Sequence, residues 1–430
     1  MQLGSSCSSS SSLCCSCSVL LLLVLTAQTR TSVRISEELV EEMQSLARQL
    51  LGQRKKRKPV GFVPAAAAAK FACSLSLPLH SAAARGVFKV AADTNPARHA
   101  AVFESSSSSS SSGGEKGGDG AAAEGSAAAA AAAAAGEGEG KVISVSSGAD
   151  GAVVFFNLLQ QKQIEKIQAH AKACKTFLLH PTEPLLVTGS DDKTVKIWRG
   201  SSDFSSSYSL GVTLRRQRGE IGGLALHPLN NYFAAVSSDR TWAFISFQEG
   251  RYLGVYRDLA CQYASLAFHP DGMIMGGGGV DGSVYIWDMK GQQQRAALQG
   301  HTERINKLTF SENGYYLATA SADGTVRLWD LRKSASFQTL DLNEDKEKEK
   351  EKERVMSAVF DNSGLYLAAC TSSGVVKLYN FESRAHATAV ATLRGHTDAV
   401  MDCAFVEGEK MLLTASMDKT VKVWKVGEDN

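Results

Sequence analysis

Histidine, serine and aspartate recur at fixed spacing in this sequence, and these residue types together can perform nucleophilic hydrolysis. Counting from a histidine, a serine lies at +20, an aspartate at +22 and a tryptophan at +28. Three such tetrads are present: His170, Ser190, Asp192 and Trp198; His301, Ser321, Asp323 and Trp329; His396, Ser416, Asp418 and Trp424. Catalysis needs one convergent site with an oriented base and an oxyanion pocket. A set repeated three times indicates architecture rather than a catalytic centre.

The elements that position one tetrad can be read between residues 300 and 332. Two apolar runs, Ile305–Phe310 and Tyr315–Ala320, are separated by an Asn-Gly pair, and an Asp-Gly pair follows them. Alternating apolar residues between such turn signals predict antiparallel strands. We expect His301 to hydrogen-bond Asp323 at the tight turn, with Ser321 bridging toward the indole nitrogen of Trp329. The pattern is typical of one WD40 blade of a β-propeller.

Four weaker copies of the aspartate-to-tryptophan hairpin extend the repeat. They pair Asp281 with Trp287, Asp239 with Ile245, Asp150 with Phe156, and Ser373 with Tyr379. The seven hairpins end at positions 156, 198, 245, 287, 329, 379 and 424. Blades of about 40–45 residues are usual for this architecture. The sequence therefore predicts an all-β, seven-bladed WD40 propeller at residues 71–430, preceded by a short helix and low-complexity segments.

The residues before the propeller divide into three segments. Residues 1–34 are a low-complexity leader with a short apolar run, and we expect disorder or a misassigned reading-frame start. Residues 35–58 predict a helix (Ser36–Gln53) with a seam of Leu39, Met43, Leu46 and Leu50. This helix could dock on the propeller or a partner, or it could self-associate. Residues 59–70 form an alanine-rich linker.

Three features concern the closure of the ring and its interruptions. Phe71–Leu79 is expected to pair with the last blade as its outer strand, which removes an open sheet edge. Residues 104–140 are rich in serine, glycine and alanine, and residues 344–354 alternate in charge. Such segments bury little apolar surface, so both are predicted to be disordered insertions.

Charge and cysteine content limit the chemistry that we expect. The net charge of +2 gives no basic excess for gripping phosphates, so direct sequence-specific nucleic-acid binding is not expected. The cluster Arg54, Lys55, Lys56, Arg57 and Lys58 predicts nuclear targeting. Five cysteines outside the leader are expected to be buried, reduced thiols, and no metal or cofactor is expected. Gly276–Gly279 lacks the lysine of a phosphate loop and is expected to relieve crowding instead.

Several segments resemble the pre-mRNA-processing factor 19 family. The similarity lies in Phe310–Ala320 with Leu328–Lys333, in Trp242-Ala243-Phe244, in Phe268–Gly272, in Leu77–Ala82 and in the helix that ends in the basic cluster. The resemblance implies a scaffold and substrate receptor of the spliceosome-associated nineteen complex. It also implies ubiquitin ligation, a role in DNA repair and a nuclear location. The U-box and oligomerising coiled coil of the family are not recognisable in residues 1–34, so ligase activity and homo-oligomerisation are left open.

Propellers bind partners through loops that gather at each mouth of the ring. Trp242, Tyr263 and Arg304 are candidates for a protein-binding surface, with packing or solvated roles as the plain alternatives. A generic WD40 adaptor without ligase activity is the second functional hypothesis. A secreted or membrane-tethered propeller is the third, but no membrane partner is expected because the run Val19–Leu25 is too short to cross a bilayer.

Overall fold

The computed structural model describes most of the chain after its first residues. The described residues are 35–56, 70–81, 83, 86–93, 142–200, 207–258, 261–343, 353–383, 386–406 and 410–426. The leader 1–34, most of the linker and the insertion 104–140 lie outside the described residues. No helix in the described ranges is both long and apolar enough to cross a membrane.

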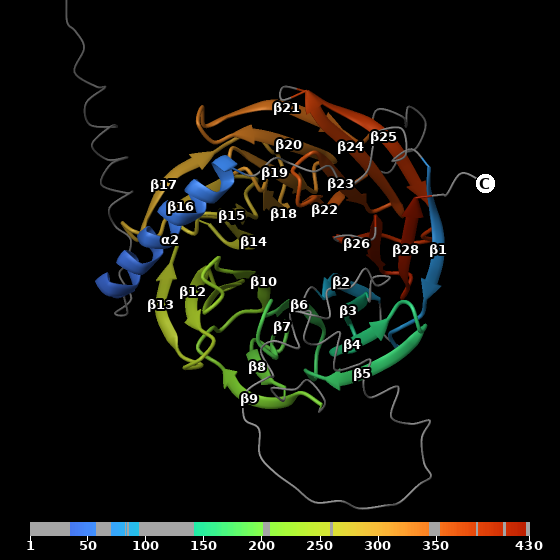
Figure 1. Cartoon of the computed structure of the whole chain (residues 1–430), viewed down its shortest axis with the longest axis horizontal. Coiled ribbons are helices and arrows are strands. Elements are labelled where there is room, and N and C mark those ends of the chain that lie inside the picture. The colour runs from blue at the N-terminus through green and yellow to red at the C-terminus, as the bar shows by residue number, and fades with distance from the viewer. Residues whose placement is uncertain are drawn as a thin grey trace, which may run out of the picture.

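Seven four-stranded antiparallel sheets are arranged as blades around a central axis (Figure 1). Blades 1 and 2 consist of β2 (Val87–Asp93), β3 (Ile143–Gly148), β4 (Ala152–Asn157) and β5 (Lys162–Gln168), then β6 (Cys174–Leu179), β7 (Leu185–Ser190), β8 (Val195–Arg199) and β9 (Ser209–Leu214). Blades 3 and 4 consist of β10 (Ile221–Leu226), β11 (Tyr232–Ser237), β12 (Thr241–Ser246) and β13 (Tyr252–Arg257), then β14 (Tyr263–Phe268), β15 (Ile274–Gly279), β16 (Val284–Asp288) and β17 (Gln293–Leu298). The predicted seven-bladed propeller is confirmed.

The remaining blades complete the ring. Blades 5 and 6 consist of β18 (Ile305–Phe310), β19 (Tyr316–Ser321), β20 (Thr325–Asp330) and β21 (Ala335–Asp341), then β22 (Val355–Phe360), β23 (Tyr366–Thr371), β24 (Val375–Ser383) and β25 (His386–Arg394). Blade 7 consists of β26 (Val400–Val406), β27 (Met411–Ser416), β28 (Val421–Val426) and, from the other end of the chain, β1 (Phe71–Leu77).

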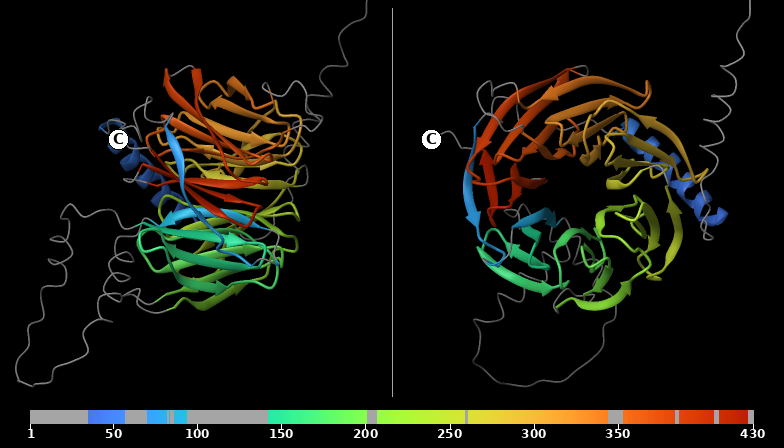
Figure 2. Two further views of the ribbon diagram at one scale, coloured as in Figure 1. Left: turned by 90° about the vertical axis from the view of Figure 1, so that its right-hand side faces the viewer. Right: turned by 180° about the vertical axis from the view of Figure 1, so that it is seen from behind.

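Ring closure follows the prediction. Strand β1 pairs antiparallel with β28, from Phe71 opposite Val426 to Leu77 opposite Val421. Lys422 Nζ donates to Ser76 Oγ at 3.1 Å, which adds a side-chain contact across the same pair. Because the first strand completes the last blade, the edge of β28 is covered (Figure 2).

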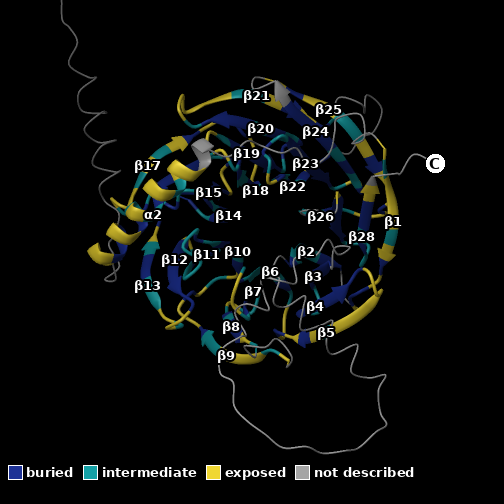
Figure 3. Ribbon diagram, in the orientation of Figure 1, coloured by how far each residue is buried: buried dark blue, intermediate teal, exposed yellow. Residues whose placement is uncertain are grey.

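Burial and register explain why the blades repeat so regularly. The middle strands are buried while the outer strands β5, β9 and β25 are largely exposed (Figure 3). The innermost strand of every blade carries a register shift near its start, as between Ile305 and Lys307 in β18. A bulge increases local twist, so it helps each sheet to turn from the axis toward the rim.

Helix α2 (Glu37–Lys56) lies on one flat face of the ring (Figures 1 and 2). Ser36 caps the helix, since its Oγ accepts a hydrogen bond from Leu39 N at 3.4 Å. Leu39, Val40 and Met43 are buried in a cluster with residues of blades 3 and 4. Gln292 Nε2, from blade 4, donates to the carbonyl oxygen of Ile35 at 2.9 Å. Of the alternatives that the sequence left open, the structure shows the first, a helix docked on its own propeller.

The second predicted insertion, 344–354, overlaps two residues that the structure describes. Residues 344–352 lie outside the described residues, but Glu353 is buried and its N–H donates to Asn343 Oδ1 at 2.9 Å. Arg354 N donates to Ser372 Oγ at 3.0 Å. The prediction of disorder through residue 354 is therefore wrong at its end, because these two residues already belong to the entry of blade 6.

Candidate functional site

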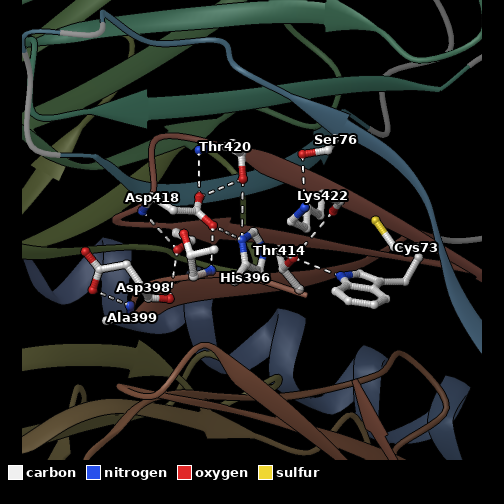
Figure 4. Close-up of polar contacts among 12 residues, drawn as sticks. Cys73, Ser76, His396, Asp398, Ala399, Thr414, Asp418, Thr420 and Lys422 are labelled. Carbon is white, nitrogen blue, oxygen red and sulfur yellow. Dashed lines mark hydrogen bonds and ion pairs between the residues drawn. The ribbon is translucent and has the colours of Figure 1, made fainter. Parts of the chain in front are cut away.

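The tetrad of blade 7 forms a closed hydrogen-bond chain (Figure 4). The two ring nitrogens of His396 lie 2.7 Å from Asp418 Oδ2 and 2.7 Å from Thr414 Oγ1. Trp424 Nε1 donates to the same threonine hydroxyl at 2.9 Å. Thr420 Oγ1 donates to Asp418 at 2.6 Å. The chain joins the third strand of the blade to the loop that enters it.

The same chain is present in blades 2 and 5. His170 lies 2.7 Å from Asp192 and 2.8 Å from Thr188, and Trp198 donates to Thr188 at 3.0 Å. In blade 5 the corresponding partners of His301 are Asp323 at 2.8 Å and Thr319 at 2.7 Å, with Trp329 donating to Thr319 at 2.9 Å. The expected histidine–aspartate bonds are thus present in all three tetrads.

The predicted role of the tetrad serines is wrong. Ser321 Oγ donates to the carbonyl oxygen of Glu303 at 3.0 Å and accepts from Asp323 N at 3.1 Å. Ser190 and Ser416 hold the equivalent backbone positions in their blades. The bridge to the indole is instead the threonine two residues earlier, because its hydroxyl reaches both the imidazole and the tryptophan.

The protonation pattern suits a structural role. Burial lowers the pKa of His170 despite the nearby Asp192 carboxylate, which favours a neutral imidazole. Burial acts to raise the pKa of Asp323, but hydrogen bonds from His301 and Thr325 outweigh it and hold that pKa well below its usual range. One ring N–H then donates to the aspartate, and the other nitrogen accepts the threonine O–H.

Hydrolytic chemistry finds no support in these contacts. The ring nitrogen that would act as a base contacts a buried threonine, not the serine, and that threonine is also bonded by an indole N–H. The serine hydroxyls donate to backbone carbonyls. The tetrads of blades 2, 5 and 7 therefore fix turns and contain no nucleophile paired with a base.

Blade 1 contains a fourth such turn that sequence reasoning missed. His80 lies 2.9 Å from Asp150 Oδ1 and 3.0 Å from Ser146 Oγ. Ser146 precedes Asp150 by four residues, as Thr319 precedes Asp323. That short spacing was the available signal. The histidine lies 70 residues before the aspartate instead of 22, because the insertion intervenes.

Blade 4 achieves the same closure with other residues. Tyr263 OH accepts the indole N–H of Trp287 at 3.0 Å and donates to Asp258 Oδ2 at 2.6 Å. The residue at the position of Thr319 is Gly277, where an added Cβ would lie 2.8 Å from the Tyr263 ring. An added Cβ at Gly276, Gly278 or Gly279 would also lie close to neighbouring side chains. The four glycines relieve crowding, as the sequence indicated.

The candidate partner residues separate into buried and exposed. Trp242 and Tyr263 are 1% and 2% exposed and belong to the cluster between blades 3 and 4. The hypothesis that they form a partner surface is wrong, because the packing of blades 3 and 4 buries them. Arg304 is exposed at the entry of blade 5. Of the basic cluster, Arg54–Lys56 end helix α2, while Arg57 and Lys58 lie outside the described residues.

The two flat faces of the ring differ in construction. The histidine–aspartate turns lie where each blade is entered and between its second and third strands, on what we name the turn face. Helix α2 packs near Leu229 and Met273, which lie between first and second strands and hence at the opposite ends, on the helix face. There His227 and His269 each bond the backbone of the next blade, reaching Gly272 O at 3.1 Å and Gly314 O at 2.8 Å. The sequence analysis did not anticipate these links.

The described cysteines show neither the exposure with a lowered pKa that a reactive thiol needs nor the grouping that a metal site needs. Cys174, Cys261, Cys370 and Cys403 are buried, whereas Cys73 is exposed on β1, contrary to the expectation of burial. Burial raises the pKa of the Cys174 thiol to about 12 and that of Cys261 to about 11. Within the described ranges no group of histidine, cysteine and carboxylate side chains could hold a metal ion.

Known proteins resemble this chain over the propeller. A family model described as the N-terminal domain of nucleolar protein 10-like proteins, a β-propeller, matches residues 266–430, and a WD domain G-beta repeat matches residues 161–199. Pre-mRNA-processing factor 19 of Bos taurus is 33% identical over 284 residues, covering 66% of this chain and 53% of that protein. The Caenorhabditis elegans protein is 32% identical over 285 residues, 66% of this chain and 54% of its own length.

A plant relative matches a shorter region. Pre-mRNA-processing factor 19 homolog 2 of Arabidopsis thaliana is 34% identical over 174 residues, which is 40% of this chain and 33% of that protein. The chain therefore spans about half or less of the length of these relatives. The resemblance seen in the sequence is confirmed: over the aligned part of its length, this chain is a homologue of the pre-mRNA-processing factor 19 proteins.

Proposed function

We propose that this chain is a WD40 scaffold of pre-mRNA splicing that acts by binding other proteins. The observation that carries the proposal is the 33% identity to pre-mRNA-processing factor 19 over 284 residues, a stretch too long for one blade. Propellers bind through the loops on their faces. The histidine, aspartate and threonine groups of the described blades are committed to holding turns, which leaves surface binding as the function that the geometry supports best.

The finer form of the proposal follows the family. The propeller would receive partners and substrates within the nineteen complex, in the nucleus, as part of a ubiquitin ligase assembly. The basic residues at the end of α2 would support nuclear import. A role in DNA repair would follow from the same association. The alternative is a WD40 adaptor outside splicing, which would bind proteins that are not part of the spliceosome.

Affinity purification of the epitope-tagged full chain tests the proposal. We expect spliceosomal small nuclear RNAs and their proteins to be enriched from nuclear extract, relative to the tag alone, and to be lost at high salt only gradually. Ubiquitin-transfer activity in the same eluate supports the finer form. Enrichment of other proteins without spliceosomal RNA would favour the generic adaptor and contradict the splicing proposal.

Localisation gives a second, independent readout. In cells, the full chain is expected to accumulate in the nucleus, and replacing Arg54, Lys55, Lys56, Arg57 and Lys58 by glutamine should shift it to the cytoplasm. Replacing the five surface residues Lys162, Lys166, Lys172, Lys193 and Lys290 by glutamine removes the same charge elsewhere and is the matched control. Nuclear exclusion of the unmodified chain would contradict the proposal.

A further inference from the structure

Five arginines gather at the turn-face end of blade 3. They are Arg215, Arg216, Arg218, Arg240 and Arg257, and the side chains of all five are exposed. The first three occupy the loop between β9 and β10, Arg240 lies in the turn between β11 and β12, and Arg257 ends β13. We name this set the arginine rim.

Hydrogen bonds and strand pairing hold the three segments of the arginine rim together. Arg218 N donates to Asp239 Oδ2 at 2.7 Å, which ties the entry loop to the β11–β12 turn. Asp258 N donates to the carbonyl oxygen of Arg240 at 2.9 Å, and Arg257 is the cross-strand neighbour of Thr241. The five side chains therefore emerge from one fixed platform rather than from independent loops.

Nearby carboxylates are already occupied. Asp239 accepts from Arg218 N and from Thr241 N at 3.0 Å, and Thr241 Oγ1 also donates to it. Glu220 pairs with Lys175 at 3.0 Å, and Asp258 accepts the hydroxyl of Tyr263. Within the described residues, no ion pair joins Arg215, Arg218 or Arg257 to a carboxylate. Arg215, Arg218 and Arg257 thus present positive charge that no carboxylate of the described residues neutralises.

The turn face of blades 5 to 7 lacks such an excess. At the same end of blades 5 to 7, exposed charges of both signs alternate: Glu303, Arg304, Asp341, Arg354, Arg394 and Asp398. The net charge of the whole chain is only +2. The arginine rim is therefore a local patch of positive charge on a nearly neutral protein.

The surroundings of the rim favour a peptide over a nucleic acid. Single strands bind on exposed aromatic rings that stack with bases, and Tyr315, the exposed aromatic of the described residues, belongs to the helix face, on the loop between β18 and β19. Clustered arginines bind separate carboxylate or phosphate groups through paired N–H donors.

We propose that the arginine rim of blade 3 binds an acidic peptide segment of a protein partner, with glutamate, aspartate or phosphoserine side chains as the recognised groups. This proposal rests on the proposed function of the propeller as a protein-binding scaffold. Arg216 would contribute from a fixed position, since its guanidinium lies 5.8 Å from the centre of the Tyr252 ring and its backbone N–H donates to Tyr252 OH at 3.2 Å.

Fluorescence anisotropy with two labelled peptides tests this surface on the full chain. One peptide carries glutamates and the other carries phosphoserines at the same positions, with a glutamine peptide as blank. We expect both acidic peptides to bind in a salt-dependent manner, and we expect R215Q/R218Q/R257Q to weaken binding about tenfold, since three rim charges are lost. The relative affinity of the two peptides tells which anion the rim prefers.

The matched control is K166Q/R354Q/R394Q, which removes the same charge from the same face at blades 1 and 6 and should change affinity less than about twofold. Equal weakening by both triple variants, or no binding by the unmodified chain, would overturn the proposal. Tighter binding of a single-stranded RNA than of either peptide, lost with the rim variant, would also overturn it. If the unmodified chain co-purifies with spliceosomal RNA but binds neither acidic peptide, the proposal for this surface fails while the scaffold proposal stands.

Discussion

Blades 4 and 5 are neighbours that close the same turn in different ways. In blade 5 the indole of Trp329 donates to Thr319, which in turn contacts His301. In blade 4 the indole of Trp287 donates to Tyr263 OH, and Gly277 leaves the space that the tyrosine ring fills. Both blades satisfy a buried indole N–H, so the requirement is a hydroxyl at that point in space and not a particular residue in the repeat.

Among the substitutions that test this comparison, replacing Thr319 by valine should lower the free energy of unfolding most. Valine has a similar shape but no hydroxyl, so the indole N–H of Trp329 and a ring nitrogen of His301 both lose their buried partner. An unsatisfied buried polar group costs about 1–3 kcal/mol, and we expect the free energy of unfolding to fall by about 2–4 kcal/mol. Urea denaturation measures it, with the exposed Thr392→Val as control. A loss no larger than that of the control would mean that the hydroxyl does not bridge.

The second test converts blade 4 toward blade 5. Gly277→Thr alone should lower the free energy of unfolding by about 1–3 kcal/mol, because its Cβ would lie against the ring of Tyr263. Tyr263→Ile alone leaves the indole of Trp287 without its acceptor. In the double variant the new threonine accepts that N–H in the freed space, so it should be more stable than either single variant.

The double-mutant cycle of Gly277→Thr and Tyr263→Ile tests whether the side chains at these two positions compete for the same space. Residues in contact show coupling of about 0.5–3 kcal/mol in double-mutant cycles. Denaturation of the four proteins gives the coupling free energy directly. Strict additivity would contradict the description of Tyr263 as a substitute for the threonine and histidine of blade 5.

A third prediction concerns the pH dependence of blade 5. The pKa of Asp323 is held below its usual range in the folded chain, so its carboxylate adds stability above the unfolded pKa of about 3.9. That contribution is lost as the pH falls through the lower folded pKa. Asp323→Asn should therefore cost about 1–2 kcal/mol at pH 7, and the difference from the unmodified chain should shrink in acid. Urea titrations at neutral and acidic pH test this, and a constant difference would contradict it.

The sequence predicted the features that depend on local signals. Hairpin turns and apolar alternation define the strands, and ring closure by Phe71–Leu77 follows from the need to cover an edge. His80 was missed because an insertion breaks the spacing to Asp150. Trp242 could not be assigned to the core, since its burial depends on the packing of blade 3 against blade 4, which no local pattern encodes.

The choice between Thr319 and Ser321 shows a second limit of sequence reasoning. Residues two apart on a strand point to the same side, so both hydroxyls of β19 face the entry loop and spacing alone does not rank them. The register and the position of the indole decide which one bridges. The arginine rim shows the same limit, because its members come from three segments that meet only in the folded blade.

The smallest expected effect is the one that separates these two hydroxyls. Ser321→Ala removes a hydrogen bond to the carbonyl oxygen of Glu303 and one from Asp323 N, while the contacts of Trp329 and His301 with Thr319 remain. We expect a loss of about 1 kcal/mol in the free energy of unfolding, clearly less than for Thr319→Val. Thr319→Ser keeps a hydroxyl at the bridge and should fall between the two. If Ser321→Ala proved the costlier change, the serine would be the bridge that the repeat spacing suggested, and the equivalence between the tyrosine of blade 4 and the threonine of blade 5 would fail with it.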